Sequence, residues 1–536
     1  MSGTGRGAEQ LRELVARVGP GDAATRAAAL GEVTTEDLEA VLHPQGTGDR
    51  HVLAIGLGAS PGVASGVAVF DAWRGLDAVD DGADVILVRP ETSPADEPCL
   101  GVASGVVTSR GGMASHAAVI ARGRGLPAVC GVASLSIGDD ALTTSDGVVV
   151  REGEVISIDG STGEILLGAL DVSSSDVPDA LHVVLGWADD VRSGRLTVEA
   201  NADSAADAGV ARALGAAGIG LCRTEHQFLG PERLPLLQRA ILAGGAEDER
   251  AALDQLAVAQ RADFEALLAV MDGLPVTVRL LDPPLHEFLP DLVALEVQQA
   301  NGTLDEAGVT LLAAARRWHE HNPMLGVRGA RLGILRPELY RLQVRALVEA
   351  AAAVVSRGGE PRPQVLVPLV STVAELVAVR RLVETEVASV APDGPALPVG
   401  VMVETPRAAL LAGRLAEVAD FLSFGTNDLT QMTFGFSRDD VGRMLDTYLS
   451  SGLLDADPFV TLDPDGVGRL VATAVAAARA ARPDLPIGVC GEHAADPASI
   501  RLLLDAGVDH LSCSPWRVPV ARLAGAQAVL ADPTRI

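Results

Sequence analysis

The sequence predicts an α/β protein that contains two structured domains. Its 536 residues are 48% hydrophobic and 21% charged, which is typical of a globular chain with room for roughly two to four domains. Over residues 51–170, short β-rich runs alternate with glycine turns, and from about residue 196 apolar runs recur with helical segments between them. Because the second pattern repeats eight times, we expect an α/β domain followed by a TIM (β/α)8 barrel.

Residues 1–50 predict an N-terminal tail with a short helical segment, which is too small to be a domain. Residues 1–20 are rich in glycine and polar side chains, so we expect a loose terminus there. Residues 21–43 predict helix, because cap-forming threonines precede an apolar periodic segment. A polar linker then runs to about Arg50.

The α/β domain is expected over residues 51–170. Its candidate strands are residues 65–70, 84–88, 103–107, 147–150 and 154–158. The next stretch, 171–195, is rich in serine and aspartate at first and predicts a linker with some helix. Linkers at about 44–50 and 171–195 would bracket the domain and let it swing.

The barrel is expected over residues 196–536. Its candidate strands are residues 196–201, 217–222, 275–281, 364–370, 398–403, 420–425, 486–490 and 509–513. Two stretches between strands, 223–274 and 282–363, are long, and extra helices there would shape an entrance or a subunit interface. Catalytic groups of such barrels come from the C-terminal ends of the strands.

Charge and cysteine usage exclude several classes of function. The formal net charge is −29, so the chain should bind neither nucleic acid nor an anionic membrane unaided. All 42 positions counted as lysine or arginine are arginine, which excludes a Schiff-base lysine and a P-loop lysine. Five scattered cysteines, no leader-like N-terminus and no apolar run of about 18 residues predict a cytoplasmic protein without a membrane span.

One histidine lies in a setting suited to an anion. An apolar run over 102–107 predicts a strand end, two glycines then allow a tight turn, and a helix-forming run follows. His116 therefore falls in the first helical turn, where free backbone N–H groups and the positive end of the helix dipole collect. Arg110 and Arg122 add positive charge nearby. His116 could carry a phosphoryl group on a ring nitrogen, and the alternative is a partly buried structural histidine.

Polar side chains gather at the predicted strand ends of the barrel. They are Arg223, Arg279, Glu404, Asn427, Asp428 and Cys490. Glu404 and Asp428 are hard oxygen ligands, and a few such ligands with substrate oxygens are the usual way to hold Mg²⁺. Cys490 would protonate an enolate left behind by phosphoryl transfer. Alternatively, Cys490 is a small buried hydrophobic residue.

Arginines supply the positive charge that an anionic substrate requires. Arg223 and Arg279 can form bidentate pairs with carboxylate or phosphate. Arg328 and Arg438 would add to that cluster, although neither lies on a predicted strand end. The whole set suits a small anion that carries both phosphate and carboxylate. Taken singly, each arginine could instead form a surface ion pair contributing about 0–1 kcal/mol.

Several motifs together resemble the phosphoenolpyruvate (PEP)-utilising enzymes. They are the segment Thr108–Arg122, RTEH from Arg223, VTVRLLDPPLHEFLP over 276–290, residues 322–332, ETPR from Glu404, GTNDLTQ over 425–431 and GEH from Gly491. The DPPLHEFLP run, residues 437–442 and residues 512–515 resemble the pyruvate, phosphate dikinase branch more than the sugar-phosphotransferase enzyme I branch. The resemblance covers about residues 21–536.

The resemblance implies a role for each matching position. His116 would be the phosphohistidine intermediate on a swivelling α/β domain, and Cys490 the proton donor. PEP or pyruvate would bind, with Mg²⁺, at Arg223, Arg279, Glu404, Gly425, Thr426, Asn427 and Asp428. Dimerisation through the barrel is expected as well.

Two departures from the family pattern affect the expected activity. About 50 residues precede the α/β domain, so we expect no ATP-grasp nucleotide domain, only the PEP half-reaction, and a separate ATP-grasp partner. Ala114 stands where the family often has a regulatory threonine, so that control should be absent. The alternatives are an enzyme I-like phosphocarrier that donates to a small protein and a non-catalytic PEP-binding regulator.

Overall fold

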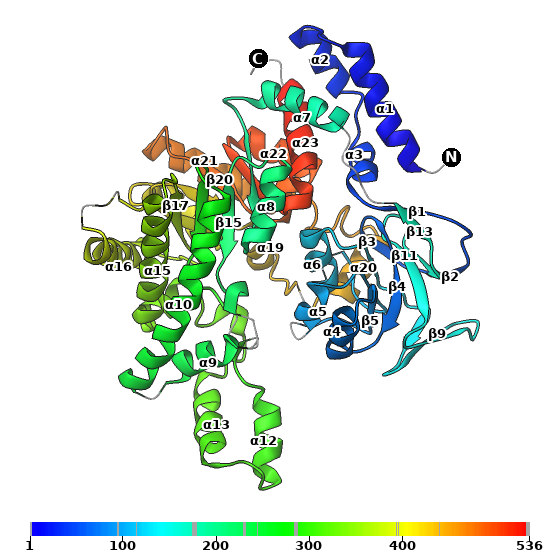
Figure 1. The fold of residues 1–536 in the computed structure, drawn as a ribbon. Helices are drawn as coiled ribbons and strands as arrows, with labels where there is room; N and C mark the ends of the chain where they lie inside the picture. The colour runs from blue at the N-terminus through cyan, green and yellow to red at the C-terminus, as the bar shows by residue number, and fades with distance from the viewer. Residues whose placement is uncertain are drawn as a thin grey trace.

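The fold combines an α/β domain with a closed parallel barrel (Figure 1). The computed structural model describes residues 3–93, 96–113, 115–173, 179–228, 232–243, 245–283, 288–392, 394, 396–438 and 440–531. The predicted fold class, an α/β domain followed by a TIM (β/α)8 barrel, is confirmed. Among the described helices, none is both long and apolar enough to span a membrane.

The barrel is a ring of parallel strands that closes where β14 pairs with β21. Its strands are β14 (Thr197–Asn201), β15 (Ile219–Arg223), β16 (Pro275–Arg279), β17 (Arg362–Val367), β18 (Val399–Val403), β19 (Leu422–Phe424), β20 (Ile487–Val489) and β21 (His510–Cys513). Each overlaps one of the eight predicted apolar runs. The apolar runs are long because these strands are buried on both faces, against the barrel interior and against the outer helices.

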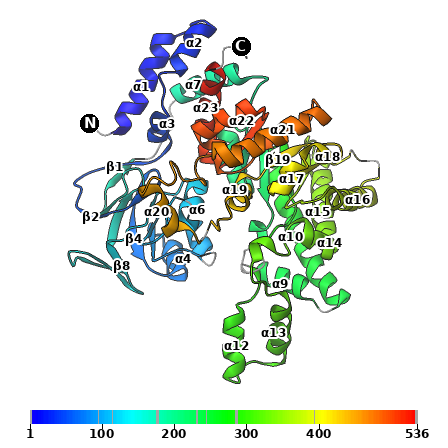
Figure 2. The same ribbon diagram turned by 180° about the vertical axis from the view of Figure 1, so that it is seen from behind.

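Helices form the outer layer of the barrel (Figures 1 and 2). They are α8 (Ala205–Ala213), α10 (Ala246–Val270), α15 (Pro337–Ser356), α16 (Val373–Val390), α17 (Pro406–Leu410), α18 (Ala412–Ala416), α21 (Arg469–Ala481), α22 (Pro497–Ala506) and α23 (Val518–Leu530). The N-terminus of α16 is fixed by a capping box between Thr372 and Glu375. Two further helices, α19 (Thr426–Phe434) and α20 (Gly442–Ser450), follow β19 on the side of the α/β domain.

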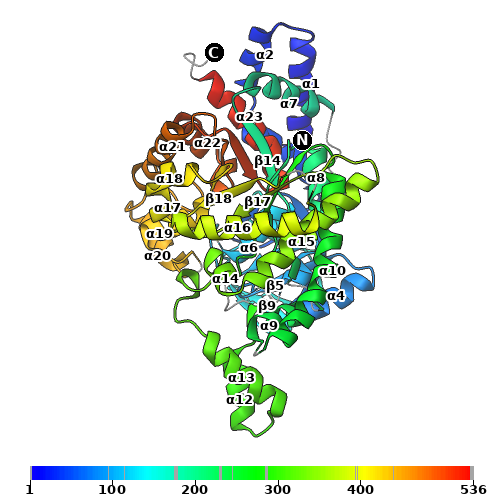
Figure 3. The same ribbon diagram turned by 90° about the vertical axis from the view of Figure 1, so that its left-hand side faces the viewer.

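The long stretches between strands contain the predicted extra helices. These include α9 (Leu234–Leu242), α12 (Leu292–Ala300), α13 (Glu306–Trp318) and α14 (Ala330–Leu335). Helices α12 and α13 pack on each other around Leu295 and Leu312 and project away from the barrel (Figure 3).

The α/β domain is a single sheet with the strand order β2-β12-β11-β4-β5-β6-β7-β3. Its strands are β2 (Val52–Ile55), β3 (Leu57–Ser60), β4 (Val63–Val69), β5 (Val85–Arg89), β6 (Gly105–Thr108), β7 (Ala128–Cys130), β11 (Val155–Asp159) and β12 (Glu164–Leu167). One face is covered by α4 (Ala72–Asp80), α5 (Glu97–Leu100) and α6 (His116–Arg124). The other face packs against the small sheet of β8 (Leu135–Ile137), β9 (Ala141–Thr144) and β10 (Val149–Arg151).

Strands β4, β5, β6 and β7 run parallel, and this arrangement positions the histidine segment. The loops that follow β5 and β6 leave the same edge of the sheet, because Arg89 and Thr108 are paired at the ends of these two strands. His116 therefore lies beside residues that precede it by about 20 positions in the sequence.

The expectation of a loose terminus over residues 1–20 is wrong, because α1 spans Gly3–Val18. Leu11, Leu14 and Val18 recur at helical spacing and are buried, so tertiary packing overrides the glycines near the N-terminus. The predicted helix over 21–43 is confirmed as α2 (Ala23–Leu30) and α3 (Thr35–Leu42). These helices pack on α7 (Asp179–Arg192) and α23 of the barrel (Figure 1).

The chain enters and leaves the α/β domain at neighbouring points. Strand β1 (Gln45–Thr47) pairs antiparallel with β13 (Asp171–Ser173), and the two lie within the predicted linkers. A two-stranded crossing of this kind is compatible with a swinging domain. The domain boundaries at 51, 171 and 196 stay predictions.

Candidate active site

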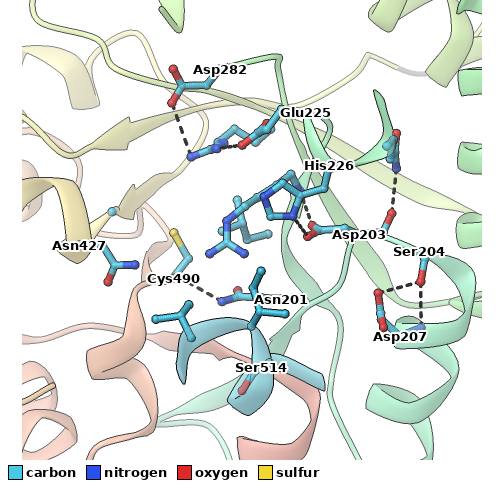
Figure 4. Close-up of a pocket in the computed structure, with 18 of the residues that line it drawn as sticks. Asn201, Asp203, Ser204, Asp207, Glu225, His226, Asp282, Asn427, Cys490 and Ser514 are labelled. Carbon is cyan, nitrogen blue, oxygen red and sulfur yellow. Dashed lines mark hydrogen bonds and ion pairs between the residues drawn. The ribbon is translucent and has the colours of Figure 1, made fainter. Parts of the chain in front are cut away.

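A cavity of about 890 Å³ lies where the α/β domain meets the C-terminal rim of the barrel. Its walls include nearly all the predicted site residues, namely His116, Arg223, Arg279, Arg328, Glu404, Gly425, Asn427, Asp428, Arg438 and Cys490. Figure 4 shows side chains from both parts of the chain around this space. The fold thus brings a histidine of one domain to the strand ends of the other.

His116 is the first residue of α6, as predicted. Gly111 has a φ of +99°, which makes the tight turn before the helix, and the Ser115 side chain caps it by accepting from the Ala118 N–H at 3.4 Å. The imidazole is held on both sides. Its Nδ1 lies 3.0 Å from the Thr92 hydroxyl, and its Nε2 lies 3.5 Å from Glu97 Oε1.

The two arginines of the histidine segment differ in what they contact. Arg122 is not directed at an anion, because it donates to the carbonyls of Ala59 and Met113 and so holds the loop in place. Arg110 is exposed. Ala114, which stands where the family often has a regulatory threonine, lies outside the described residues, so the expected absence of that control stays a prediction.

Two of the predicted arginines are already paired with buried carboxylates. Arg279, at the end of β16, forms an ion pair with Glu225, and its Nη1 lies 3.7 Å from Asp282 Oδ2. Arg328 donates from Nε and Nη2 to the two oxygens of Asp282 at 2.8 Å and 2.7 Å. Its Nη1 is 3.5 Å from Asp428 Oδ1. The bidentate pair with Asp282 fixes the guanidinium plane of Arg328 at the cavity wall.

Arg223 ends β15, and its backbone N–H donates to Asp203 at 2.6 Å. Within the described part of the chain, its guanidinium has no hydrogen bond or ion pair. It therefore remains available to a ligand in the cavity. Asp203 also pairs with His226 at 2.9 Å, and Figure 4 shows this pair beside the cavity.

Glu404 is a fully buried carboxylate directly after β18. Its Oε1 accepts from the Leu369 N–H, and Leu369 has a φ of +52°, the one positive φ among the described non-glycine residues. Its Oε2 is buried and has no hydrogen-bond partner among the residues that the structure describes. Burial, together with the charge of Asp428, raises the pKa of Glu404 to about 8.

The residues around Glu404 fit a divalent cation. Asp428 lies in the first turn of α19, close enough to raise the Glu404 pKa. A cation between these carboxylates would engage the orphaned oxygen and offset the repulsion. The described residues contain no cluster of three or more His, Cys, Asp or Glu side chains suited to a metal. Two carboxylates with substrate oxygens are the Mg²⁺ type of site rather than an all-protein cage.

Gly425 permits the close approach of α19 to Glu404. A Cβ at this position would lie 2.7 Å from Glu404 Oε2 and 2.9 Å from its Cβ. Any side chain here would therefore displace the carboxylate, which explains why a glycine precedes the helix.

Cys490 follows β20 and is buried at the cavity wall. Its Sγ accepts from the Ser423 hydroxyl at 3.3 Å and lies 3.6 Å from the Phe424 carbonyl, which the S–H can reach. Burial raises the pKa of this thiol to about 11, so it stays protonated at neutral pH. A protonated thiol facing the cavity is chemically suited to donate a proton to a carbanion.

Thr426 is the predicted site residue whose side chain does not line the cavity. It is fully buried, and its Oγ1 lies 2.8 Å from His493 Nδ1. His493 Nε2 faces the Pro458 carbonyl at 2.9 Å, which can only accept, so Nδ1 accepts from the threonine hydroxyl. Thr426 thus fixes the turn before α19, while the neighbouring Asn427 reaches the cavity and accepts from the Glu492 N–H.

Sequence reasoning missed several residues of the site. Glu225 and Asp282 lie two and three positions beyond predicted strand-end arginines, so the strand-end rule could have included them. Glu97 could have been found only from the pairing of β5 with β6. The Leu369 N–H has no signal in the sequence, because a backbone donor depends on local φ rather than on residue type.

A domain that presents a histidine to a barrel rim lined by arginines, two carboxylates and a thiol defines a class of phosphoryl-transfer enzyme. The chain belongs to the PEP-utilising enzymes: residues 180–529 match the PEP-utilising enzyme, PEP-binding domain, and residues 82–163 match the PEP-utilising enzyme, mobile domain.

Curated relatives specify the similarity further. The chain is 46% identical to pyruvate, phosphate dikinase 1, chloroplastic, of Arabidopsis thaliana over 98% of its own length and 55% of the relative's. It is 46% identical to pyruvate, phosphate dikinase 2 of Oryza sativa subsp. japonica over 98% of its length and 60% of the relative's. The chain therefore spans little more than half the length of these relatives.

Proposed function

We propose that this chain catalyses reversible transfer of a phosphoryl group between PEP and His116, forming or consuming pyruvate, as one half-reaction of a pyruvate, phosphate dikinase. The supporting observation is the shared cavity, which contains both the histidine and the rim residues Arg223, Glu404 and Cys490. The names of the dikinase relatives support the same assignment.

In the proposed reaction, the arginines bind the substrate anion and His116 attacks it. Arg223 and Arg438 have side chains at the cavity wall, and Arg279 and Arg328 hold their planes through carboxylate pairs. The Thr92 hydroxyl accepts the Nδ1–H of His116, which leaves the Nε2 lone pair for phosphorus. The Nε2–P bond forms as the P–O bond to the enolate breaks.

The enolate then becomes pyruvate. The thiol of Cys490 gives its proton to the methylene carbon and is reprotonated from solvent before the next turnover. Mg²⁺ held by Glu404 and Asp428 would supply positive charge that stabilises the phosphoryl and enolate oxygens. In the reverse direction, the thiolate removes a methyl proton from pyruvate and phosphohistidine returns the phosphoryl group.

The second acceptor of the phosphoryl group also belongs to the proposal. We expect an ATP-grasp nucleotide-binding protein to receive His116 when its domain swings away from the barrel. A homodimer formed through the barrel and a cytoplasmic location are further expectations. The five buried free cysteines favour the reducing environment of a cytoplasm.

The direct test uses PEP labelled with ³²P on its phosphoryl group. Incubation of the purified chain with Mg²⁺ should give acid-labile label on protein and one equivalent of pyruvate per site. His116→Asn should give neither, whereas His182→Asn, which changes an α7 histidine outside the cavity, should behave as the unaltered chain. Label that survives in His116→Asn contradicts the proposal.

The same assay separates the alternatives. Transfer of label from His116 to AMP and pyrophosphate after addition of an ATP-grasp protein supports the dikinase assignment. Transfer to a small histidine-containing protein alone supports an enzyme I-like phosphocarrier. Mg²⁺-dependent binding of PEP by calorimetry without label or pyruvate supports a non-catalytic regulator.

A further inference from the structure

Glu97 places a carboxylate beside Nε2 of His116, the ring nitrogen that does not face Thr92. Its Oε1 lies 3.5 Å from Nε2, while Nδ1 is engaged with Thr92. The side chain is 18% exposed and lines the cavity. Glu97 is the first residue of α5, which is anchored by the fully buried Cys99 and Leu100. The carboxylate is therefore held near the nitrogen by packed backbone rather than by a flexible loop.

Asp96, the residue before Glu97, is held by its own contacts. Asp96 accepts from the N–H and hydroxyl of Ser93 and lies 3.2 Å from Arg89 Nε. Arg89 in turn ends β5, the strand that pairs with the one leading to His116. The distance between Glu97 and His116 thus follows from the sheet itself.

Glu97 is ionised in this setting. Burial raises the pKa of its carboxyl, but the hydrogen bond and the charge that His116 supplies in its protonated form, with the charges of His226 and Arg124, lower this pKa below its usual value. His226 belongs to the barrel, so the carboxylate also faces the opposite domain. It stands at the point where the phosphoryl group passes from one domain to the other.

We infer that Glu97 sets the equilibrium of phosphoryl transfer at His116, favouring the free imidazole over phosphohistidine. This inference rests on the proposed function. When the Nε2–P bond forms and the P–O bond to the enolate breaks, a dianion replaces a neutral lone pair beside the Glu97 carboxylate. The proton on Nδ1 stays with the ring, which becomes cationic, and the proton of Cys490 passes to the enolate carbon. Only the phosphoryl dianion is a new neighbour of like charge for Glu97.

Repulsion between these charges makes phosphohistidine a stronger donor. Even with the screening of bulk water, the repulsion between the carboxylate and a dianion about 5 Å away exceeds its attraction to the new ring cation about 4 Å away, and the net effect disfavours that state by about threefold. A destabilised phosphohistidine transfers its group more readily to a second acceptor and returns it more readily to pyruvate enolate. Glu97 therefore keeps the carrier near balance between its two partners.

The experiment measures the equilibrium constant of the half-reaction by acid quench. Known mixtures of labelled PEP and pyruvate are equilibrated with the full chain and Mg²⁺, and the ratio of phosphorylated to free protein is read. Glu97→Gln removes the charge with little change in shape, and it should raise this constant by about threefold or more. Glu97→Asp keeps the charge on a shorter side chain, and its equilibrium constant should lie between those of the unaltered chain and Glu97→Gln.

The matched control is Glu91→Gln, which removes an exposed carboxylate of the same loop outside the cavity and should leave the constant unchanged. If the equilibrium constant is unchanged or lower in Glu97→Gln while the unaltered chain is labelled normally, only the inferred role of Glu97 is overturned, and the proposed function stands. Failure of the unaltered chain to take up label overturns the proposed function instead. A purely structural role would change stability and rates but not this equilibrium ratio.

Discussion

Replacement of Cys490 by alanine tests the proposed proton donor most directly. Because the pKa of the thiol is about 11, nearly all of Cys490 is protonated at pH 8, and the thiolate is only about a thousandth of the total. A positioned general acid contributes about 10²–10⁴-fold, so pyruvate formation should slow by that factor in Cys490→Ala. The affinity for PEP measured by calorimetry should change little, because the thiol is proposed to act on the methylene carbon rather than to bind the phosphate.

The pH dependence gives a second, sharper signature. Removal of a methyl proton from pyruvate needs the thiolate, so this exchange should accelerate by about tenfold per pH unit between pH 7 and 10. Pyruvate formation needs the thiol and should show no loss through its ionisation over that range. The assay is proton NMR of pyruvate in deuterated buffer with Mg²⁺.

Cys513→Ala is the control for these measurements. Cys513 is equally buried and its pKa is raised to about 12, but it does not line the cavity. Its replacement should leave methyl exchange and pyruvate formation intact. Exchange that is as fast in Cys490→Ala as in the unaltered chain would refute the assignment of the proton donor.

Three further outcomes follow from individual contacts. Gly425→Ala puts a Cβ 2.7 Å from Glu404 Oε2, so calorimetry should show Mg²⁺-dependent PEP binding weakened by about tenfold or more. Arg328→Met leaves the fully buried Asp282 without its bidentate partner and should lower the free energy of unfolding in urea by about 3–5 kcal/mol. Burial lowers the pKa of His43 from 6.5 to about 4, so between these values the unfolded chain binds a proton that the folded chain does not. The contribution of His43 to the free energy of unfolding should therefore be fully present above pH 6.5 and fall by about 3 kcal/mol toward pH 4. His43→Phe should remove this pH dependence from the free energy of unfolding measured in urea.

The barrel could be predicted in detail because its signal is local and repeated. Each buried strand is an apolar run of a few residues, and polar residues follow directly, as Glu404 follows Val399–Val403. The rule that strand ends carry function then located the rim without any knowledge of side-chain direction. The position of His116 was predictable for the same reason, since glycines and a helix-forming run mark a strand–turn–helix junction.

What could not be predicted depends on contacts between distant residues. Helix α1 is weakly predicted by the sequence, and it forms because Leu11 and Leu14 are buried where α1 packs on α3 and α7. Thr426 has the residue type of a ligand, but its hydroxyl is taken by His493, 67 positions later. The pairing of Arg328 with Asp282 is likewise invisible without the path of the chain between them.

The proposed binding of a small polyanion by a chain of net charge −29 depends on how the charges at the cavity are paired. Arg279 and Arg328 are balanced by the buried carboxylates of Glu225 and Asp282, so these two pairs orient donors without adding net positive charge. Arg223, whose guanidinium has no ion pair among the described residues, supplies positive charge that the other two do not.

Part of the remaining negative charge at the cavity lies on Glu404 and Asp428, whose mutual repulsion contributes to the raised pKa of Glu404. A substrate phosphate placed beside these carboxylates without a cation would add a third negative group. Mg²⁺ bound there would reverse the sign of the interaction, and the substrate would in turn complete the coordination that two carboxylates leave open. PEP and Mg²⁺ should therefore bind with strong reciprocal coupling, each raising the affinity of the other by the same factor, because the two ligands close one thermodynamic cycle.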